Sequence, residues 1–241
     1  MRTLTPVVKQ ILIGCIVLFA GTYLMEARNI DLRQWLSVFY PRSPLFKPWQ
    51  LVTHMFMHGN LGHIVFNMFA LVSIGSVIER FMGGKKFLQL YFISGFGAIL
   101  VHFISQAVEL YNITGMWFPS LSDMGMTVVD ERVRAVGPMS QTQYDEIFQL
   151  VFGPVLGASG AIYGVVVAFA YLFPNSELMI MFIPYPIKAK YLVPAFIVLD
   201  VILGISSIQG DSIAHFAHFG GALFGFALVF YWRKFDKRNF Y

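Results

Sequence analysis

The sequence is poor in charge. Asp, Glu, Lys and Arg make up 12% of its 241 residues, about half of what a soluble domain carries. A globular domain free in the cytosol is therefore excluded. Disorder is excluded as well, because 57% of the residues are hydrophobic and the chain has 25 Phe, 11 Tyr and 4 Trp. A mean hydropathy of +0.65 agrees with both exclusions and favours an integral membrane protein.

Cysteine is almost missing, since Cys15 is the only one. One cysteine excludes an intramolecular disulfide and a metal site built from several thiolates. The chain also lacks internal repeats, low-complexity tracts and a second soluble domain. Its length suits one compact membrane domain over residues 1–241.

Apolar segments that could cross a bilayer occur six times. A spanning helix needs about 20 mostly apolar residues. The expected spans are residues 8–25, 56–78, 87–108, 157–173, 191–208 and 214–232. The first could instead be a signal peptide, but its apolar stretch is longer than is usual there, which favours a retained helix. The pattern predicts an all-α polytopic membrane protein with a six-helix bundle.

Basic residues predict the orientation of these spans. With the N-terminus inside, most of the 17 Lys and Arg residues fall in cytoplasmic segments, from Arg2 at the start to Lys237 and Arg238 at the end. Such segments carry an excess of Lys and Arg, so both termini are expected in the cytoplasm. The same distribution explains the net charge of +4, and no nucleic-acid partner is expected because no binding motif accompanies it.

Two outer segments, residues 26–55 and 109–156, are long. In the second, which is the enlarged one, Ser140 followed by Gln143 is typical of a capping box, and apolar residues recur at helical spacing up to Val151. We expect a short amphipathic helix there, at the membrane surface. Residues 130–134 are expected to form another turn.

Polar side chains inside the second span are candidates for function, because such groups are costly at membrane depth. His63 and Asn67 are four residues apart, so they share one helix face and can donate hydrogen bonds to one point. The alternative is that they only bridge to neighbouring helices.

Ser159 lies in the sequence Gly157-Ala158-Ser159-Gly160, where the fourth span begins. Backbone N–H groups are unpaired in the first turn of a helix, and the positive end of the helix dipole lies there. This environment suits an oxyanion, which forms when a serine hydroxyl attacks a carbonyl. Gly160 and Gly164 also allow another helix to approach closely, and packing alone would explain them.

The sixth span carries His218 on a strip of small residues, with Ala214 one turn before it and Gly221 and Ala222 one turn after it. This strip can pack against the small residues of the fourth span, which would bring the imidazole to Ser159. Imidazole is the usual base that activates a hydroxyl. The three groups together predict acyl transfer to serine, most simply peptide-bond hydrolysis.

The sequence resembles the rhomboid intramembrane serine proteases over essentially its whole length. The features that carry the resemblance are the six spans, His63-x-x-x-Asn67, Gly157-Ala158-Ser159-Gly160, Ala217-His218-x-Gly220-Gly221 and Gly75-x-x-x-Glu79-x-x-x-Gly83, in that family's order.

The resemblance implies roles for individual residues. Ser159 would be the nucleophile and His218 the general base, in a dyad without a third carboxylate. His63, Asn67 and the backbone N–H of Ser159 would bind the oxyanion, and Tyr163 would pack against the catalytic imidazole.

The resemblance also implies supporting roles outside this dyad. Gly157 would support the site, and His54 and His58 would tie the first outer segment to the second span and retain water. Glu79 would fix the cytoplasmic end of that span. Substrates would be transmembrane proteins that enter from the lipid bilayer beside the fifth span, where Asp200 is expected to make a hydrogen bond inside the bundle rather than to gate entry.

Two departures from the family pattern stand out. Trp49 is followed by Gln50 where the family often has Arg, which leaves open how the first outer segment is anchored. The second is the enlarged segment 109–156, whose role stays open.

Two rival interpretations remain. One is an inactive relative of the same fold that binds membrane proteins without cutting them. The other is a metal site or transporter, suggested by six His residues, with His54 and His58 four apart. The zinc-peptidase pattern His-Glu-x-x-His is missing, His102 stands alone, and neither metal nor cofactor is expected. A short chain favours a bacterial plasma membrane, and the oligomeric state stays open.

Overall fold

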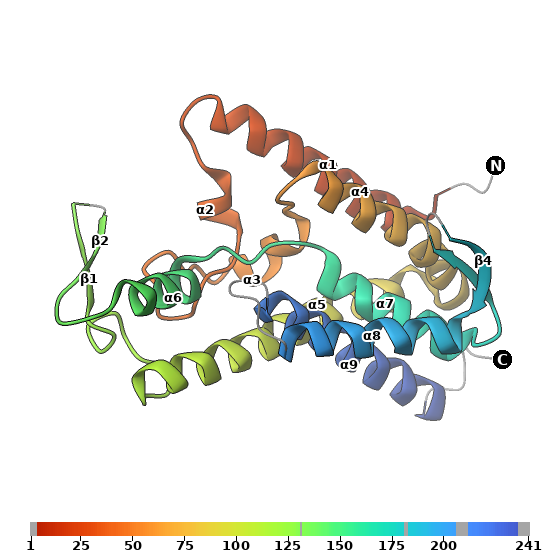
Figure 1. Ribbon diagram of the computed structural model, residues 1–241. Helices are drawn as coiled ribbons and strands as arrows, with labels where there is room; N and C mark the ends of the chain where they lie inside the picture. Colours follow the sequence, from red (N-terminus) through yellow and green to blue (C-terminus); the bar gives the residue numbers. More distant parts are fainter. Residues whose placement is uncertain (1–3, 131, 181–182, 206–211, 236–241) are drawn as a thin grey trace.

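The computed structural model describes all residues except 1–3, 131, 181–182, 206–211 and 236–241. The helices are α1 (Pro6–Glu26), α2 (Leu32–Leu36), α3 (Gln50–Thr53), the 3-10 helix η1 (His54–Phe56), α4 (Leu61–Ala70), the π-helix η2 (Leu71–Gly75), α5 (Ser76–Thr114), α6 (Gln141–Phe152), α7 (Ser159–Leu172), α8 (Ala189–Ile205) and α9 (Ser212–Phe235). The fold is mostly helical (Figure 1).

Two small antiparallel hairpins depart from the expected all-α fold. Strand β1 (Met126–Val129) pairs with β2 (Arg132–Ala135), and β3 (Glu177–Ile180) pairs with β4 (Ile183–Lys188). The turn expected over residues 130–134 belongs to the first hairpin, with Asp130 in the left-handed region at φ 50°. The second hairpin joins α7 to α8, in a segment between two expected spans.

Each expected span contains a helix. The second and third are continuous in the structure, because α4, η2 and α5 follow one another and the chain kinks at Gly83, where φ is 82°. Among the described residues, two helical segments are long and apolar enough to cross a membrane, 6–26 and 61–114, and α7 is a shorter apolar helix. The end of the fifth expected span (206–208) lies outside the described residues, as do Arg2, Lys237 and Arg238.

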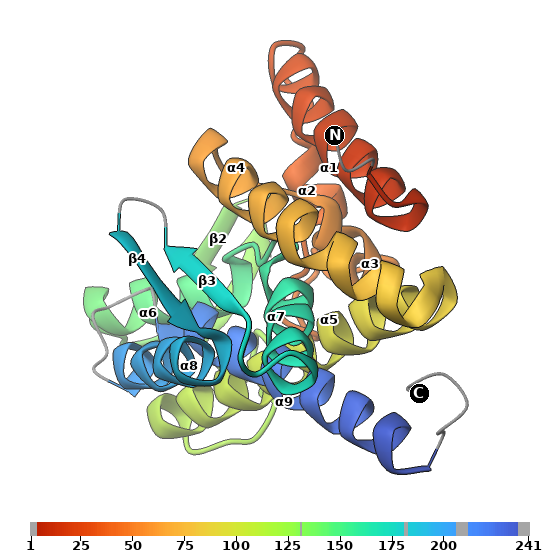
Figure 2. The same ribbon diagram turned by 90° about the vertical axis from the view of Figure 1, so that its right-hand side faces the viewer.

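Helix α7 lies in the middle of the bundle, with α5 and α9 packed against it and α4 and α8 nearby (Figure 2). Glycines make this close packing possible. A Cβ atom on Gly221 would collide with the backbone of Gly160, and one on Gly225 with the backbone of Gly164. The predicted contact between the small residues of the fourth and sixth spans is therefore confirmed.

Glu79 fixes the start of α1. Its two carboxylate oxygens accept hydrogen bonds from the backbone N–H groups of Val7 and Val8, each at 2.9 Å. These donors belong to the first turn of α1 and have no partner inside that helix. Glu79 is buried, and its structural role agrees with the expectation.

The two ends of the molecule differ. The beginning of α1, the end of α9 and the β3–β4 hairpin lie at one end, and β1, β2 and α6 lie at the other (Figure 1). This arrangement is the one expected if both termini lie on the same side of a membrane and the enlarged outer segment on the opposite side.

The enlarged outer segment has a hydrophobic cluster of its own, which includes Leu110, Met126 and Ile147. The capping box at Ser140 and Gln143 is present at the start of α6, so the predicted helix is confirmed. The first outer segment packs against it: Tyr40 belongs to the same cluster, and the Arg42 guanidinium donates to the carbonyl of Phe118 at 2.6 Å.

Candidate active site

Ser159 and His218 face each other across the contact between α7 and α9. Oγ of Ser159, the first residue of α7, lies 2.9 Å from Nε2 of His218. The ring of Tyr163, one turn later on α7, stacks on the imidazole with a centroid distance of 4.4 Å and an interplanar angle of 5°. The structure thus brings together three residues that the sequence predicted as neighbours.

Asp200 corrects one part of the sequence interpretation. Oδ2 of this α8 residue lies 3.0 Å from Nδ1 of His218, and Oδ1 lies 2.5 Å from Nδ1 of His215. The expected hydrogen bond inside the bundle is present. The expectation of a histidine without a carboxylate partner is wrong, because the acid comes from a different helix, 18 residues before His218.

Asp200, His215 and His218 also bring their donor atoms within 4.8 Å of one another, a set that could hold a metal ion. The spacing of histidines in the sequence suggested only His54 and His58 as a metal-binding pair. His215 was not singled out, although it precedes His218 by three residues and therefore lies on nearly the same helix face. That spacing was the signal that could have found it.

The candidate oxyanion site lies on the other side of Ser159. Gly157 has φ 137°, and a Cβ atom there would lie 2.9 Å from Nε2 of His63 and 3.5 Å from Oγ of Ser159. Only glycine leaves this space open. Asn67 is buried, and its Nδ2 has no hydrogen-bond partner among the described residues. A buried amide without a partner is costly, and an oxyanion would satisfy it.

His54 connects the first outer segment to the loop before Ser159. Its Nδ1–H donates to the carbonyl of Gln50 at 2.8 Å, and its own carbonyl accepts from the N–H of Gly157 at 2.9 Å. Burial lowers the pKa of His54 to about 4, so the ring is neutral. His58 is buried beside His63, with ring centroids 5.1 Å apart.

Gln50 anchors the first outer segment where the family often has Arg. Its side-chain Nε2–H₂ group lies 3.0 Å from the carbonyl of Leu45, 3.3 Å from that of Gln34 and 3.4 Å from that of Trp35. Its Oε1 accepts the N–H of Lys47 at 2.9 Å. A carboxamide both donates and accepts, so it organises the loop without a charge.

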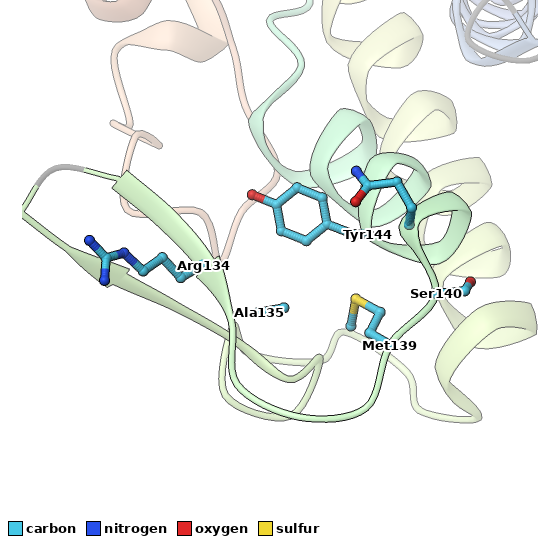
Figure 3. Close-up of a pocket in the computed structure, with 6 residues that line it drawn as sticks. Arg134, Ala135, Met139, Ser140 and Tyr144 are labelled. Atoms are coloured by element: carbon cyan, nitrogen blue, oxygen red, sulfur yellow. The ribbon is translucent and has the colours of Figure 1, made fainter.

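A separate pocket of about 300 Å³ lies in the enlarged outer segment, between β2 and the start of α6 (Figure 3). Its lining residues are Arg134, Ala135, Met139, Ser140, Gln141 and Tyr144. None of the predicted site residues lines it. His102, on α5, is buried beside Phe103. It is not among the residues that line this pocket.

The arrangement has the parts needed for acyl transfer. A hydroxyl is hydrogen-bonded to an imidazole at the first turn of a helix, and the His63 ring borders the space beside that hydroxyl. Asn67 lies one turn after His63 on α4. Helices expose apolar side chains outward, among them Phe66 and Phe69 on α4 and Leu199 and Ile202 on α8. Fold and site together define a mostly helical protein with a hydrogen-bonded serine–histidine pair inside its bundle.

Comparison with known proteins gives the family. The model of the Rhomboid domain family matches residues 45–235, which include every residue of the candidate site. The chain belongs to the rhomboid family.

Three relatives illustrate the match. Rhomboid protein 1, mitochondrial, of Saccharomyces cerevisiae is 24% identical over 184 residues, 76% of this chain and 42% of its own length. An uncharacterized mitochondrial rhomboid protein of Schizosaccharomyces pombe is 29% identical over 211 residues, 77% of this chain and 52% of its own. Rhomboid protease GlpG of Salmonella paratyphi A is 29% identical over 119 residues, which are 48% of this chain and 39% of its own length.

The chain thus spans about half or less of the length of the curated relatives it matches. Family membership implies a membrane protein. The expectation of a bacterial plasma membrane is not supported, because two of these relatives are named as mitochondrial.

Proposed function

We propose that the chain is an intramembrane serine endopeptidase that hydrolyses peptide bonds in or near transmembrane segments of membrane proteins. The observation that carries the proposal is the 2.9 Å contact between Oγ of Ser159 and Nε2 of His218 at the first turn of a buried helix. One of the matched relatives is named a protease, which agrees with it.

In the first half of the reaction, Oγ of Ser159 attacks the carbonyl carbon and its proton passes to Nε2 of His218. The tetrahedral intermediate carries the negative charge on the former carbonyl oxygen. When the C–N bond breaks, the amine takes the proton from His218 and leaves, and the acyl group stays on Oγ as an ester.

In the second half, water attacks the ester carbon and gives a proton to His218. The second intermediate collapses, the bond to Oγ breaks, and Ser159 regains the proton. The acid product departs and the enzyme returns to its starting state. No cofactor takes part in these steps.

The oxyanion would be bound by the Nδ2–H₂ of Asn67, the ring N–H of His63 and the backbone N–H of Ser159. Buried donors that wait unpaired for the transition state stabilise it without reorganisation. The open space above Gly157 is where the oxyanion would lie, because both the His63 ring and Oγ of Ser159 border it.

The proposal includes six spans with both termini in the cytoplasm. The first span would be α1. The second would be α4 with η2 and the first part of α5, and the third would be the rest of α5. The last three would be α7, α8 and α9. Ser159 would then lie toward the outer face, where the His-rich entry to α4 admits water. A substrate helix has to unwind locally, because its carbonyls are already hydrogen-bonded.

Cleavage of a tagged single-span membrane protein by the purified chain in lipid tests the proposal. The matched variants are Ser159→Ala and His218→Ala. We expect wild type to cut and both variants to lose cutting by more than about 1,000-fold. Equal cutting by all three would rule out the serine mechanism.

The alternative of an inactive relative that binds membrane proteins needs a second measurement. A fluorophosphonate probe reacts with an activated serine whatever the substrate. Labelling of wild type but not of Ser159→Ala supports the protease even if the chosen substrate is not cut. Absence of both cutting and labelling in wild type would favour the inactive relative.

A further inference from the structure

We infer that Asp200 is a positioning residue for His218, so that α7, α8 and α9 contribute a Ser159–His218–Asp200 triad. The inference rests on the proposed function, because it assigns a further residue to that same reaction. It differs from the serine–histidine dyad that the resemblance implies.

Both ring nitrogens of His218 have a defined partner. Nδ1 lies 3.0 Å from Oδ2 of Asp200, and Nε2 lies 2.9 Å from Oγ of Ser159. A carboxylate only accepts hydrogen bonds, so Nδ1 carries the hydrogen. Nε2 is then left with the lone pair that accepts the serine proton. Asp200 thereby selects the tautomer that the reaction requires.

Asp200 is itself held in place. It is 8% exposed, and its other oxygen, Oδ1, accepts from Nδ1 of His215 at 2.5 Å. The hydroxyl of Tyr163 interacts with the same carboxylate. A carboxylate on an apolar helix is costly, and these three contacts offset that cost. They also prevent the carboxylate from rotating away from His218.

Asp200 also provides charge where the reaction needs it. His218 becomes an imidazolium when it takes the serine proton, and a carboxylate 3.0 Å away stabilises that cation. The described titratable groups that face His218 are His63 from α4, Tyr163 from α7, Asp200 from α8 and His215 from its own helix. Asp200 is the acid among them.

The distances favour hydrogen bonds over a metal at this cluster. Ligand atoms around a tetrahedral zinc lie about 2.0–2.1 Å from the ion and therefore roughly 3.3 Å from one another. The 2.5 Å between Nδ1 of His215 and Oδ1 of Asp200 is shorter than that, and it is closer to the distance of about 2.7–2.9 Å between an N–H donor and a carboxylate.

Kinetics of Asp200→Asn test the inference. The asparagine amide keeps the shape but donates to Nδ1 of His218, which leaves the hydrogen on Nε2, where it blocks proton transfer from Ser159. We expect kcat to fall by roughly 10²- to 10⁴-fold while KM stays within about twofold. Asp200→Glu, which restores a carboxylate, should recover part of the loss.

The tautomer of His218 can be measured directly. Nitrogen NMR of the chain labelled with ¹⁵N-histidine distinguishes a protonated from an unprotonated ring nitrogen, and the His218 signals are assigned by their loss in His218→Gln. We expect Nδ1 protonated and Nε2 unprotonated in wild type, and the reverse in Asp200→Asn. A residue that only packs would leave the tautomer unchanged.

Three outcomes would overturn the inference. They are wild-type kcat in Asp200→Asn, an unchanged His218 tautomer in that variant, and activity that a chelator abolishes and zinc restores. If Asp200→Asn does not fold, the inference is tested by the His218 tautomer of wild type and by the activity of Asp200→Glu. If wild type neither cuts nor labels, the proposed function fails, and the tautomer still reports on Asp200.

Discussion

Gly221 on α9 and Gly160 on α7 touch backbone to backbone. A Cβ atom on Gly221 would overlap the carbonyl group of Gly160, so no larger residue fits without moving one helix. Because Ser159 adjoins Gly160 and His218 lies three residues before Gly221, this contact sets the distance between nucleophile and base.

Gly221→Ala is therefore expected to reduce both stability and activity. Overpacking costs about 1–3 kcal/mol of the free energy of unfolding, and a shift of about 1 Å between reacting groups costs about 100-fold in rate. Thermal unfolding and cleavage rate measure the two effects. Gly21→Ala in α1 is the matched control, since a Cβ there meets only a Leu32 methyl at 3.8 Å. A fully stable and active Gly221→Ala would contradict the packing argument.

Asn67→Ala is expected to separate activity from stability. Loss of one oxyanion donor lowers kcat by about 10²- to 10³-fold. The variant should keep or raise the unfolding temperature, because the buried Nδ2 has no partner among the described residues and its removal relieves an unsatisfied group. Asn112→Ala, at an exposed position of α5, should change neither. A large loss of stability in Asn67→Ala would instead indicate a structural bridge.

Gln50→Leu is expected to loosen the first outer segment. The change removes the contacts to three carbonyls and to the N–H of Lys47, and buried groups left without partners cost about 1–3 kcal/mol. The buried thiol of Cys15 reports unfolding without an added label site, so its reaction with a fluorescent maleimide during heating gives the midpoint. Gln141→Leu, at an exposed position on α6, is the control, and an equal midpoint in both variants would argue against the anchor.

The unfolding temperature is expected to fall as the pH drops from 7 to 5. His54 has a pKa of about 4 in the folded chain, because of burial, and about 6.5 when unfolded. The unfolded chain therefore binds the proton first, and folding loses about 2 kcal/mol at pH 5 from this group alone. Circular dichroism in detergent measures the effect. His54→Asn should show a shallower pH dependence, and one as steep as wild type would point to other groups.

The sequence predicted the helices and the core of the site because both leave local signals. Long apolar runs indicate spans, and the small residues around Ser159 and His218 indicate which helices touch. The two hairpins gave no comparable signal. Their strands are four to six residues long, and the turn chemistry around residue 130 alone does not separate a hairpin from a loop.

The partners of Asp200 could not be predicted from the sequence. Its unusual position on an apolar helix was visible, but its partners lie 15 and 18 residues further along the chain. Because Asp200 lies on α8 and both histidines lie on α9, the periodicity of a single helix cannot relate these positions. Only the placement of α8 beside α9 reveals that the acid and His218 meet.

The carboxylate of Glu79 has a consequence for biogenesis. The donors that it binds, Val7 and Val8, lie 72 and 71 residues earlier in the chain. At about 5–20 residues per second, a ribosome needs roughly 4–14 s to reach Glu79 after making them. During that interval the N–H groups of Val7 and Val8 lack the Glu79 carboxylate, so the contact that holds the start of α1 can form only after residue 79 has been made.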